Sequence, residues 1–253
     1  MKNIVYILTL FSVVISFAQH DDNFNKGNSL YNDGEYQEAI TVYESILKND
    51  VHSAELYFNL ANSYYKLNRI APSNYYYEKA LLLDPKDTEI KNNLVFAQNM
   101  TIDAIDVLPE IGFSKLTKNL TNTFSFDTWA LLSIVCVILF VVLFLAYYVS
   151  YTTIKKRLSF VSSFTMLCCA CITLFFAFQK YSFDKRNNPA IVFAQESDVK
   201  TEPNLRSENA FQLHEGTKVQ VLDNYNDTWT KIEITNGKQG WIPSEDIKLL
   251  NDI

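Results

Sequence analysis

The sequence GNSLY at residues 27–31 returns as ANSYY at residues 61–65, 34 positions further along the chain. The same interval relates Tyr43 to Tyr77. Self-similarity at a fixed period of this length is typical of proteins built from stacked copies of one supersecondary unit. The N-terminal third of the chain is therefore predicted to be a repeat domain.

These stretches resemble the tetratricopeptide repeat, in which small residues let two helices approach and large residues fill the space between units. The resemblance covers residues 21–100 and implies an all-α domain. We expect the second helices of the two units to begin near Tyr36 and Ile70, with Pro72 in a first turn, where a missing N–H costs little. A single helix at residues 88–98 is expected to cap the stack.

Tetratricopeptide repeats bind partner proteins in a concave groove formed by their first helices. The resemblance places five polar residues in this groove: Asn28, Asn32, Asn59, Asn62 and Lys66. In similar domains, the residues at the positions of Asn28 and Asn59 bind a C-terminal carboxylate together with a lysine. That lysine position holds Phe24 here, which argues against the carboxylate mode. The alternative is that the asparagines are only solvated surface.

Two uncharged apolar runs, residues 129–151 and 158–178, follow the repeats. A helix of about 20 apolar residues crosses a ~30 Å hydrocarbon core, so each run is long enough to span a membrane. The intervening residues 152–157 can form only a turn, and they end in three consecutive basic residues at 155–157. The sequence therefore predicts a two-helix transmembrane hairpin.

The first 18 residues resemble a secretory signal peptide, with Lys2 before an apolar stretch at residues 4–17. Such a signal would place the repeats on the periplasmic side of a bacterial inner membrane. The hairpin would return the C-terminus to that side and leave the basic turn in the cytoplasm, as the positive-inside rule prefers. This order of sides is the same whether or not the signal is cleaved.

A segment at residues 101–128 joins the repeats to the first span. Apolar residues recur in it at Leu108, Ile111, Leu116 and Leu120. This spacing predicts a short amphipathic helix after Pro109. The helix would lie on the membrane surface or pack back on the repeats.

Short alternating runs begin near residue 190 and predict a small all-β barrel over residues 190–250. The dipeptide at residues 236–237 (NG) is a typical hairpin turn. Together with the sequence GWIP at residues 240–243, these runs resemble a bacterial SH3-like (SH3b) domain. Such domains bind peptides or cell-wall material, or serve as spacers. The candidate groove residues are Tyr225, Trp229 and Trp241.

Composition excludes several classes of function. The net charge of −6 disfavours nucleic acid, whose binding needs clustered cations. All four cysteines lie inside the apolar runs, where they resemble small apolar residues rather than ligands. The three histidines have no partners at metal spacing, and no nucleophile or phosphate-loop motif is present in the sequence. We therefore expect a protein that is not an enzyme and has no cofactor or metal.

The order of signal, tetratricopeptide repeats, two-span hairpin and SH3-like domain resembles the Bacteroides aerotolerance (Bat) family, in particular its E-type members. The resemblance covers essentially the whole chain. It implies a membrane-bound scaffold that works with Bat proteins bearing von Willebrand A-type domains and with a MoxR-type ATPase, in oxidative or envelope stress. The alternative is a peptidoglycan-binding or sensing protein that acts through the SH3-like domain.

Overall fold

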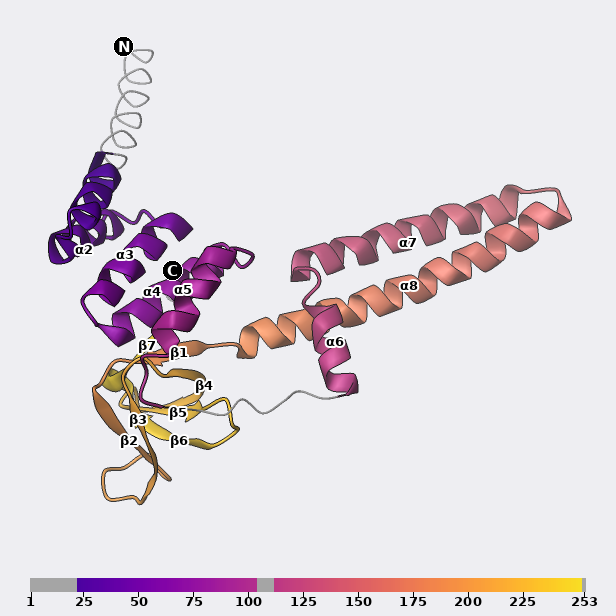
Figure 1. Ribbon diagram of the computed structural model, residues 1–253. Helices are drawn as coiled ribbons and strands as arrows, with labels where there is room; N and C mark the ends of the chain where they lie inside the picture. The colour runs from indigo at the N-terminus through magenta and orange to yellow at the C-terminus, as the bar shows by residue number, and fades with distance from the viewer. Residues whose placement is uncertain (1–21, 104–111, 252–253) are drawn as a thin grey trace, which may run out of the picture. The chain divides into compact units, whose positions relative to one another are not determined.

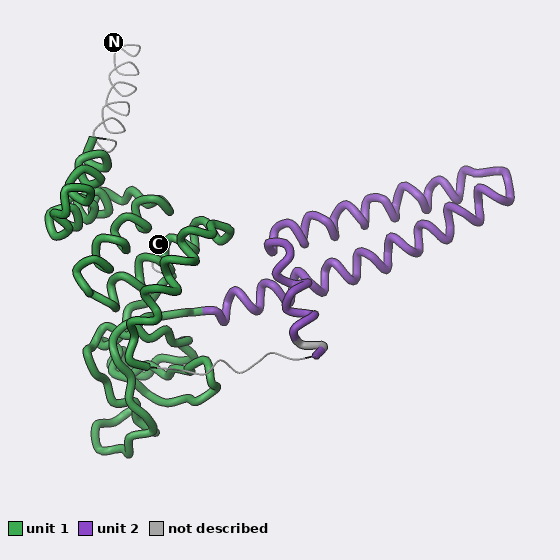
Figure 2. Tube along the Cα trace, viewed as in Figure 1, with its two compact units in different colours: residues 1–107, 188–253 green, residues 108–187 purple. Residues whose placement is uncertain are grey.

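The computed structural model describes residues 22–103 and 112–251 (Figure 1). The chain forms two compact units, one from residues 1–107 and 188–253 and the other from residues 108–187 (Figure 2). The first unit is thus discontinuous in sequence, because the second is inserted into it. The predicted signal peptide at residues 1–18 lies outside the described residues, as do Leu108, Pro109 and Ile111.

The first part of the discontinuous unit is a stack of helices. The first helix covers residues 22–32, and the others are α2 (Tyr36–Leu47), α3 (Ala54–Lys66), α4 (Ile70–Leu83) and α5 (Thr88–Gln98). The predicted starts of the second helices and of the capping helix are confirmed. Pro72 is the third residue of α4, in its first turn.

Local capping sets where two of these helices begin. The side chain of Ser53 accepts a hydrogen bond from the backbone N–H of Leu56 at the start of α3. Asp87 accepts from the backbone N–H groups of Glu89 and Ile90 at the start of α5. These bonds satisfy N–H groups that have no partner within the helix and stabilise each helix by about 1 kcal/mol.

The repeats pack through the small and large residues that the 34-residue pattern singles out. A Cβ atom at Gly27 would clash with the ring of Tyr43, so the first helix approaches α2 only because residue 27 is glycine. Tyr43 and Tyr77 are both about 1% exposed or less. They lie in two successive apolar clusters, one for each repeat.

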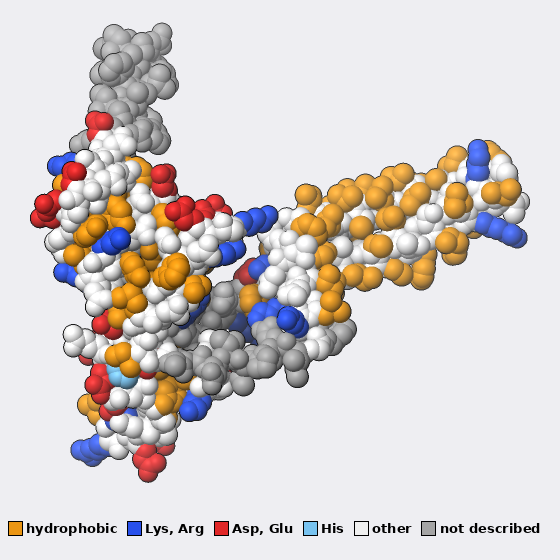
Figure 3. Space-filling view, viewed as in Figure 1, with side chains coloured by type: hydrophobic (Ala, Val, Ile, Leu, Met, Phe, Trp, Pro, Cys, Tyr) orange, Lys and Arg blue, Asp and Glu red, His pale blue; other side chains and the backbone are white. Residues whose placement is uncertain are grey.

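The second unit is dominated by two long helices, α7 (Phe126–Val149) and α8 (Thr153–Arg186). Both are long and apolar enough to cross a membrane, and hydrophobic side chains cover much of their surface (Figure 3). The helix break is shorter than the predicted turn of residues 152–157, because α8 begins at Thr153 and includes the basic residues 155–157. At 1.5 Å per residue, α8 is about 50 Å long, so it extends beyond a ~30 Å hydrocarbon core.

The two long helices meet through small side chains. Ser163, Ala170 and Ala177 recur at intervals of seven on α8 and are buried. The hydroxyl of Ser133 on α7 donates a hydrogen bond of 3.2 Å to the backbone carbonyl of Ala170. Small residues and interhelical hydrogen bonds are the usual means of association between helices in lipid.

Helix α6 (Phe113–Thr121) belongs to the hairpin unit and contacts α8. Leu116 and Leu120, which were predicted to lie on an amphipathic helix, are both on α6 and both exposed. Trp129 fixes the turn between α6 and α7, since its Nε1–H donates to the carbonyl of Thr121 at 3.1 Å. Its ring stacks on Phe176 of α8, with 5.0 Å between the centroids.

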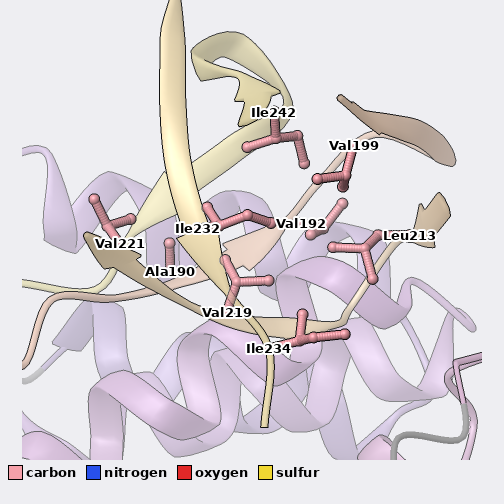
Figure 4. Packing of buried hydrophobic residues seen from close by; sticks show 9 residues of the cluster. All are labelled: Ala190, Val192, Val199, Leu213, Val219, Val221, Ile232, Ile234 and Ile242. Carbon is pink, nitrogen blue, oxygen red and sulfur yellow. The ribbon is translucent and has the colours of Figure 1, made fainter. Parts of the chain in front are cut away.

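The second part of the discontinuous unit is an antiparallel sheet with the strand order β3-β2-β6-β5-β4-β1-β7. The strands curve around one apolar core, in which the labelled side chains of Figure 4 point toward one another. The strands are β1 (Pro189–Val192), β2 (Glu196–Lys200), β3 (Asn209–His214), β4 (Lys218–Tyr225), β5 (Trp229–Glu233), β6 (Gln239–Pro243) and β7 (Ile247–Leu249), with a 3-10 turn, η1 (Ser244–Asp246), before β7.

Two glycines shape the sheet. Gly237 takes a φ of 83° in the hairpin between β5 and β6, as the dipeptide with Asn236 predicted. A Cβ atom on Gly240 would lie 2.5 Å from Val199 and 2.9 Å from the carbonyl of Lys200. The glycine therefore lets β6 approach β2 and complete the sheet.

Candidate functional site

The predicted groove of the repeats carries two copies of one hydrogen-bonded network. The Oδ1 atom of Asn28 accepts from the hydroxyl of Tyr43 at 2.7 Å and from the Nδ2 of Asn59 at 3.0 Å. One repeat later, the Oδ1 of Asn62 accepts from the hydroxyl of Tyr77 and from the Nδ2 of Asn93. Each residue of the second network is 34 positions after its equivalent in the first.

The tyrosines act as fixed donors in these networks. Burial raises the pKa of Tyr43 and of Tyr77 well above the usual range of tyrosine. Both phenols therefore keep their protons at neutral pH and hold the asparagine carbonyls in place. No described residue bonds to the Nδ2 of Asn28 or the Oδ1 of Asn59. The amide groups thus keep one donor and one acceptor that match the backbone of an extended peptide.

A pocket of about 180 Å³ lies beside the second network. It is lined by Tyr31, Asn62, Tyr65, Lys66, Tyr77, Asn93 and Phe96. Of the five predicted groove residues, Asn62 and Lys66 line this pocket, whereas Asn28 and Asn59 form the first network. Asn32 is exposed on the first helix and has no bond to either network. The pocket combines an ammonium group, amides and aromatic rings, a mixture suited to a peptide.

Asn93 and Phe96 belong to this site but were not among the predicted residues. Phe96 is 59% exposed, which is high for an aromatic side chain on a helix. Asn93 could have been found from the repeat alone, because it lies 34 residues after Asn59. The single helix α5 therefore contributes to the groove as well as closing the stack.

The SH3-like sheet packs directly on the repeats, which the sequence did not reveal. Strand β1 is buried on both faces: Ala190 and Val192 face the core of the sheet, while Ile191 packs against α4. In the same cluster, Tyr75 of α4 meets the ring of Phe193 edge-on, with 5.6 Å between the centroids. Repeats and sheet therefore share one continuous apolar interface.

Polar groups of the β3–β4 turn complete this interface. The carboxylate of Asp103, beyond α5, accepts from the backbone N–H of His214 at 2.7 Å and from the hydroxyl of Thr217 at 2.6 Å. It also lies 2.7 Å from the Nδ1 of His214. Lys218 forms an ion pair of 2.7 Å with Glu78 of α4.

Hydrogen bonding determines the charge state of Asp103. Partial burial opposes ionisation, but the hydrogen bonds from Thr217 and His214 outweigh it and lower the pKa of Asp103 below its usual value. The carboxylate is therefore ionised at neutral pH and bonded to the turn as an anion. Charge-assisted hydrogen bonds of this kind are stronger than those between neutral groups.

Gly216 of the turn lies in close contact with the repeats. Its carbonyl accepts from the Nδ2 of Asn74 at 3.0 Å, and its φ is 85°. A Cβ atom there would lie 2.6 Å from Ile70 and 2.9 Å from Thr101. Both the backbone conformation and the contact therefore require glycine.

The predicted groove residues of the SH3-like domain lie on its strands and remain partly accessible. Tyr225 is 48% exposed and meets the ring of Trp241 edge-on, with 6.2 Å between the centroids. Trp229 begins β5 and is half-buried. Tyr225 and Trp241 thus form one aromatic pair. Trp229 is the cross-strand neighbour of Tyr225 in the β4–β5 hairpin.

Comparison with known families agrees with this architecture. Residues 27–68 match the family model for the TPR repeat, and residues 54–87 match that for the tetratricopeptide repeat. Residues 197–248 match the family model for the bacterial SH3 domain. No curated protein matches the chain. The predicted fold class is confirmed: helical tetratricopeptide repeats, two apolar helices that could span a membrane, and a C-terminal antiparallel all-β sheet.

Proposed function

We propose that this protein is a membrane-anchored adaptor that binds a segment of a partner protein in the groove of its repeats. The observation that carries the proposal is the repeated asparagine network and its adjoining pocket, which offer polar groups and aromatic rings to a peptide. The match to tetratricopeptide repeats supports a role in protein–protein interaction. The hairpin would hold the complex at the bacterial inner membrane, with both ends of the chain in the periplasm.

The partners we propose follow from the resemblance to the Bat family. They are membrane proteins with von Willebrand A-type domains, together with a MoxR-type ATPase system, in an aerotolerance or envelope-stress complex. Crosslinking of the full chain in its native membrane, followed by mass spectrometry of the captured proteins, tests this assignment. Recovery of von Willebrand A-type proteins is the expected result, and their absence from a capture that yields other proteins would overturn it.

A charge reversal in the groove tests the site itself. Lys66→Glu combined with Phe96→Ala changes two exposed side chains of the pocket and should abolish capture of the partner. Lys48→Glu makes the same charge change at an exposed position at the end of α2, outside the pocket, and should leave capture intact. Equal loss in both proteins would mean that net charge, not the groove, governs binding.

The partly exposed aromatic pair of Tyr225 and Trp241 in the SH3-like domain favours a second candidate function, which is binding to peptidoglycan. The match to bacterial SH3 domains supports it. Retention of the full chain in detergent on purified cell wall, before and after Tyr225→Ala, tests this role. Retention that depends on Tyr225 would support wall binding. If the unchanged protein is not retained, wall binding is ruled out and only the adaptor function remains.

We further propose that the protein is not an enzyme. The two histidines that the structure describes are engaged in local contacts: His52 with Asp50 and Tyr57, and His214 with Asp103. The described residues include no group of three or more side chains that could hold a metal ion. Turnover of hydrolase substrates by the purified protein, lost on changing one side chain, would contradict the proposal.

A further inference from the structure

A pocket in the hairpin unit lies where α6 meets α8. It has a volume of about 390 Å³ and is lined by Thr117, Lys118, Thr121, Asn122, Phe175, Gln179 and Phe183. This volume is in the range of small-molecule sites. The side formed by α8 has two aromatic rings with an amide between them, and the side formed by α6 and its C-cap has hydroxyl, amide and ammonium groups. None of its residues belongs to the groove of the repeats or to the SH3-like sheet.

Lys118 lines the pocket and Lys180 lies next to it, and both ammonium groups lie near one aromatic ring. The Nζ of Lys118 lies 5.6 Å from the centroid of Phe183, and the Nζ of Lys180 lies 5.5 Å from it. Lys180 also donates to Asn122 and forms an ion pair with Asp184 at 2.7 Å. Lys118 therefore brings one ammonium group to the pocket, and Lys180 brings a second one beside it, already paired with a carboxylate.

The charged side chains around the pocket are mainly positive. Residues 112–127 and 179–187 carry five cationic side chains and only two carboxylates, those of Asp127 and Asp184. This excess contrasts with the net charge of −6 for the whole chain. The end of the hairpin next to α6 is therefore a local positive region in an acidic protein.

The position of the pocket identifies the kind of anion. Gln179 directly follows the apolar run of residues 158–178, so the polar side of the pocket lies at the depth of lipid headgroups if α8 spans the membrane. The exposed side chains of Leu116 and Leu120 give α6 an apolar face, as in helices that lie in the interface. Phe175 supplies an apolar wall continuous with the lipid-facing surface of α8.

We propose that this pocket binds the phosphate headgroup of an anionic phospholipid. Lys118 and Lys180 would hold the phosphate by charge, and the side-chain amide of Gln179 would donate to its oxygens. Phe175, one turn before Gln179 and inside the apolar run, would contact the glycerol and the first carbons of the acyl chains. The lipid would fix α6 against α8 at the membrane surface, a role beyond partner binding by the repeats.

The test uses the full chain in detergent micelles that contain either phosphatidylglycerol or phosphatidylcholine, with bound lipid counted by native mass spectrometry. Lys118→Gln combined with Lys180→Gln should weaken phosphatidylglycerol binding about thirtyfold, since each lysine near a membrane anion contributes about 1 kcal/mol. Lys155→Gln combined with Lys156→Gln removes the same charge at the opposite end of α8 and should leave binding unchanged.

Three results would overturn the proposal. These are equal binding of phosphatidylcholine, equal loss in both pairs of variants, or equally tight binding of soluble glycerol phosphate. The last result would assign the pocket to a free phosphate compound instead. If the double lysine variant does not fold, Asn122→Asp provides a second test. It places a carboxylate in the pocket with almost no change of size, and it should also weaken phosphatidylglycerol binding.

Discussion

Helices α4 and α7 show that burial and hydrophobicity are separate properties in this protein. The repeat helix α4 buries polar residues, among them Asn74, Glu78 and Lys79. The apolar helix α7 has a mean hydropathy of 3.0 over its most apolar stretch, of which only 11% is buried in the protein. The more polar helix is thus the more deeply enclosed one.

The difference follows from what covers each helix. Protein surrounds α4, with the other repeat helices on one side and the SH3-like sheet on the other. Its polar side chains are accommodated because the sheet supplies partners, such as the carbonyl of Gly216 for Asn74 and Lys218 for Glu78. For α7 the cover we propose is lipid, which needs apolar side chains and no partners. Changes at these two helices should therefore have different consequences.

The largest effect is expected at the contact between α4 and the sheet. Gly216→Ala would force a Cβ atom against Ile70 and Thr101 at a residue whose φ is 85°. Overpacking and a left-handed conformation together should cost about 2–4 kcal/mol. Hydrogen exchange of the full chain in detergent micelles, followed by mass spectrometry, should show loss of protection in peptides from α4.

Gly34→Ala is the matched control for this substitution. Gly34 has a φ of 84°, but a Cβ atom there would meet nothing within 4 Å. Gly34→Ala should cost only the free energy of the left-handed backbone conformation, about 1–2 kcal/mol. Peptides from α4 should keep their protection from hydrogen exchange. If the two variants expose α4 equally, the contact with the sheet does not stabilise the helix.

Much of the fold could be predicted from the sequence because it depends on local signals. The 34-residue period placed the starts of α2 and α4 near Tyr36 and Ile70, and a capping helix at residues 88–98, where the structure has them. The apolar runs indicated both long helices, although helix formation continued through residues 155–157. No local rule ends a helix at a lysine or an arginine, because both are good helix formers.

The contact between repeats and sheet could not be predicted, because it joins residues more than 100 positions apart. Asp103 gave no signal of its own, and His214 resembled an ordinary polar residue of a turn. The sequence did contain one indication in β1. Its burial on both faces requires a second layer, and the apolar run at residues 190–193 is consistent with such a strand. The groove was predicted only in part. Asn93 is equivalent to Asn59 in the 34-residue pattern, but this is apparent only when α5 is treated as the first helix of a third repeat.

A smaller effect is expected at Asp103. Asp103→Asn removes the charge that receives hydrogen bonds from His214 and Thr217, and it should destabilise the docked sheet by about 2 kcal/mol at neutral pH. Because the pKa of Asp103 is lowered in the folded protein, its contribution is complete above the unfolded value of about 3.9. It is lost as the pH falls through the lower folded value.

Unfolding followed from pH 7 down to pH 2 tests this sign. The unchanged protein should lose more stability over the acid range than Asp103→Asn, and the two curves should converge at the acid end. The ion pair between Glu78 and Lys218 also crosses the interface, so Lys218→Gln should be added to both proteins to remove it. Parallel curves in that background would show that the ionisation of Asp103 does not stabilise the interface.

The smallest effect is expected within the hairpin, where lipid rather than protein would cover most of each helix. Ser133→Ala removes the hydrogen bond to the carbonyl of Ala170 and should weaken the association of α7 and α8 by only about 0.6 kcal/mol, since interhelical hydrogen bonds in membranes are weak. Ser150→Ala makes the same change at a hydroxyl that bonds within its own helix, and it should leave association unchanged.

Unfolding of the full chain by titration with a denaturing detergent would compare the two variants. A loss above 2 kcal/mol at Ser133 would mean that the hairpin depends on specific polar contacts as strongly as α4 does, and the contrast between the two helices would not hold.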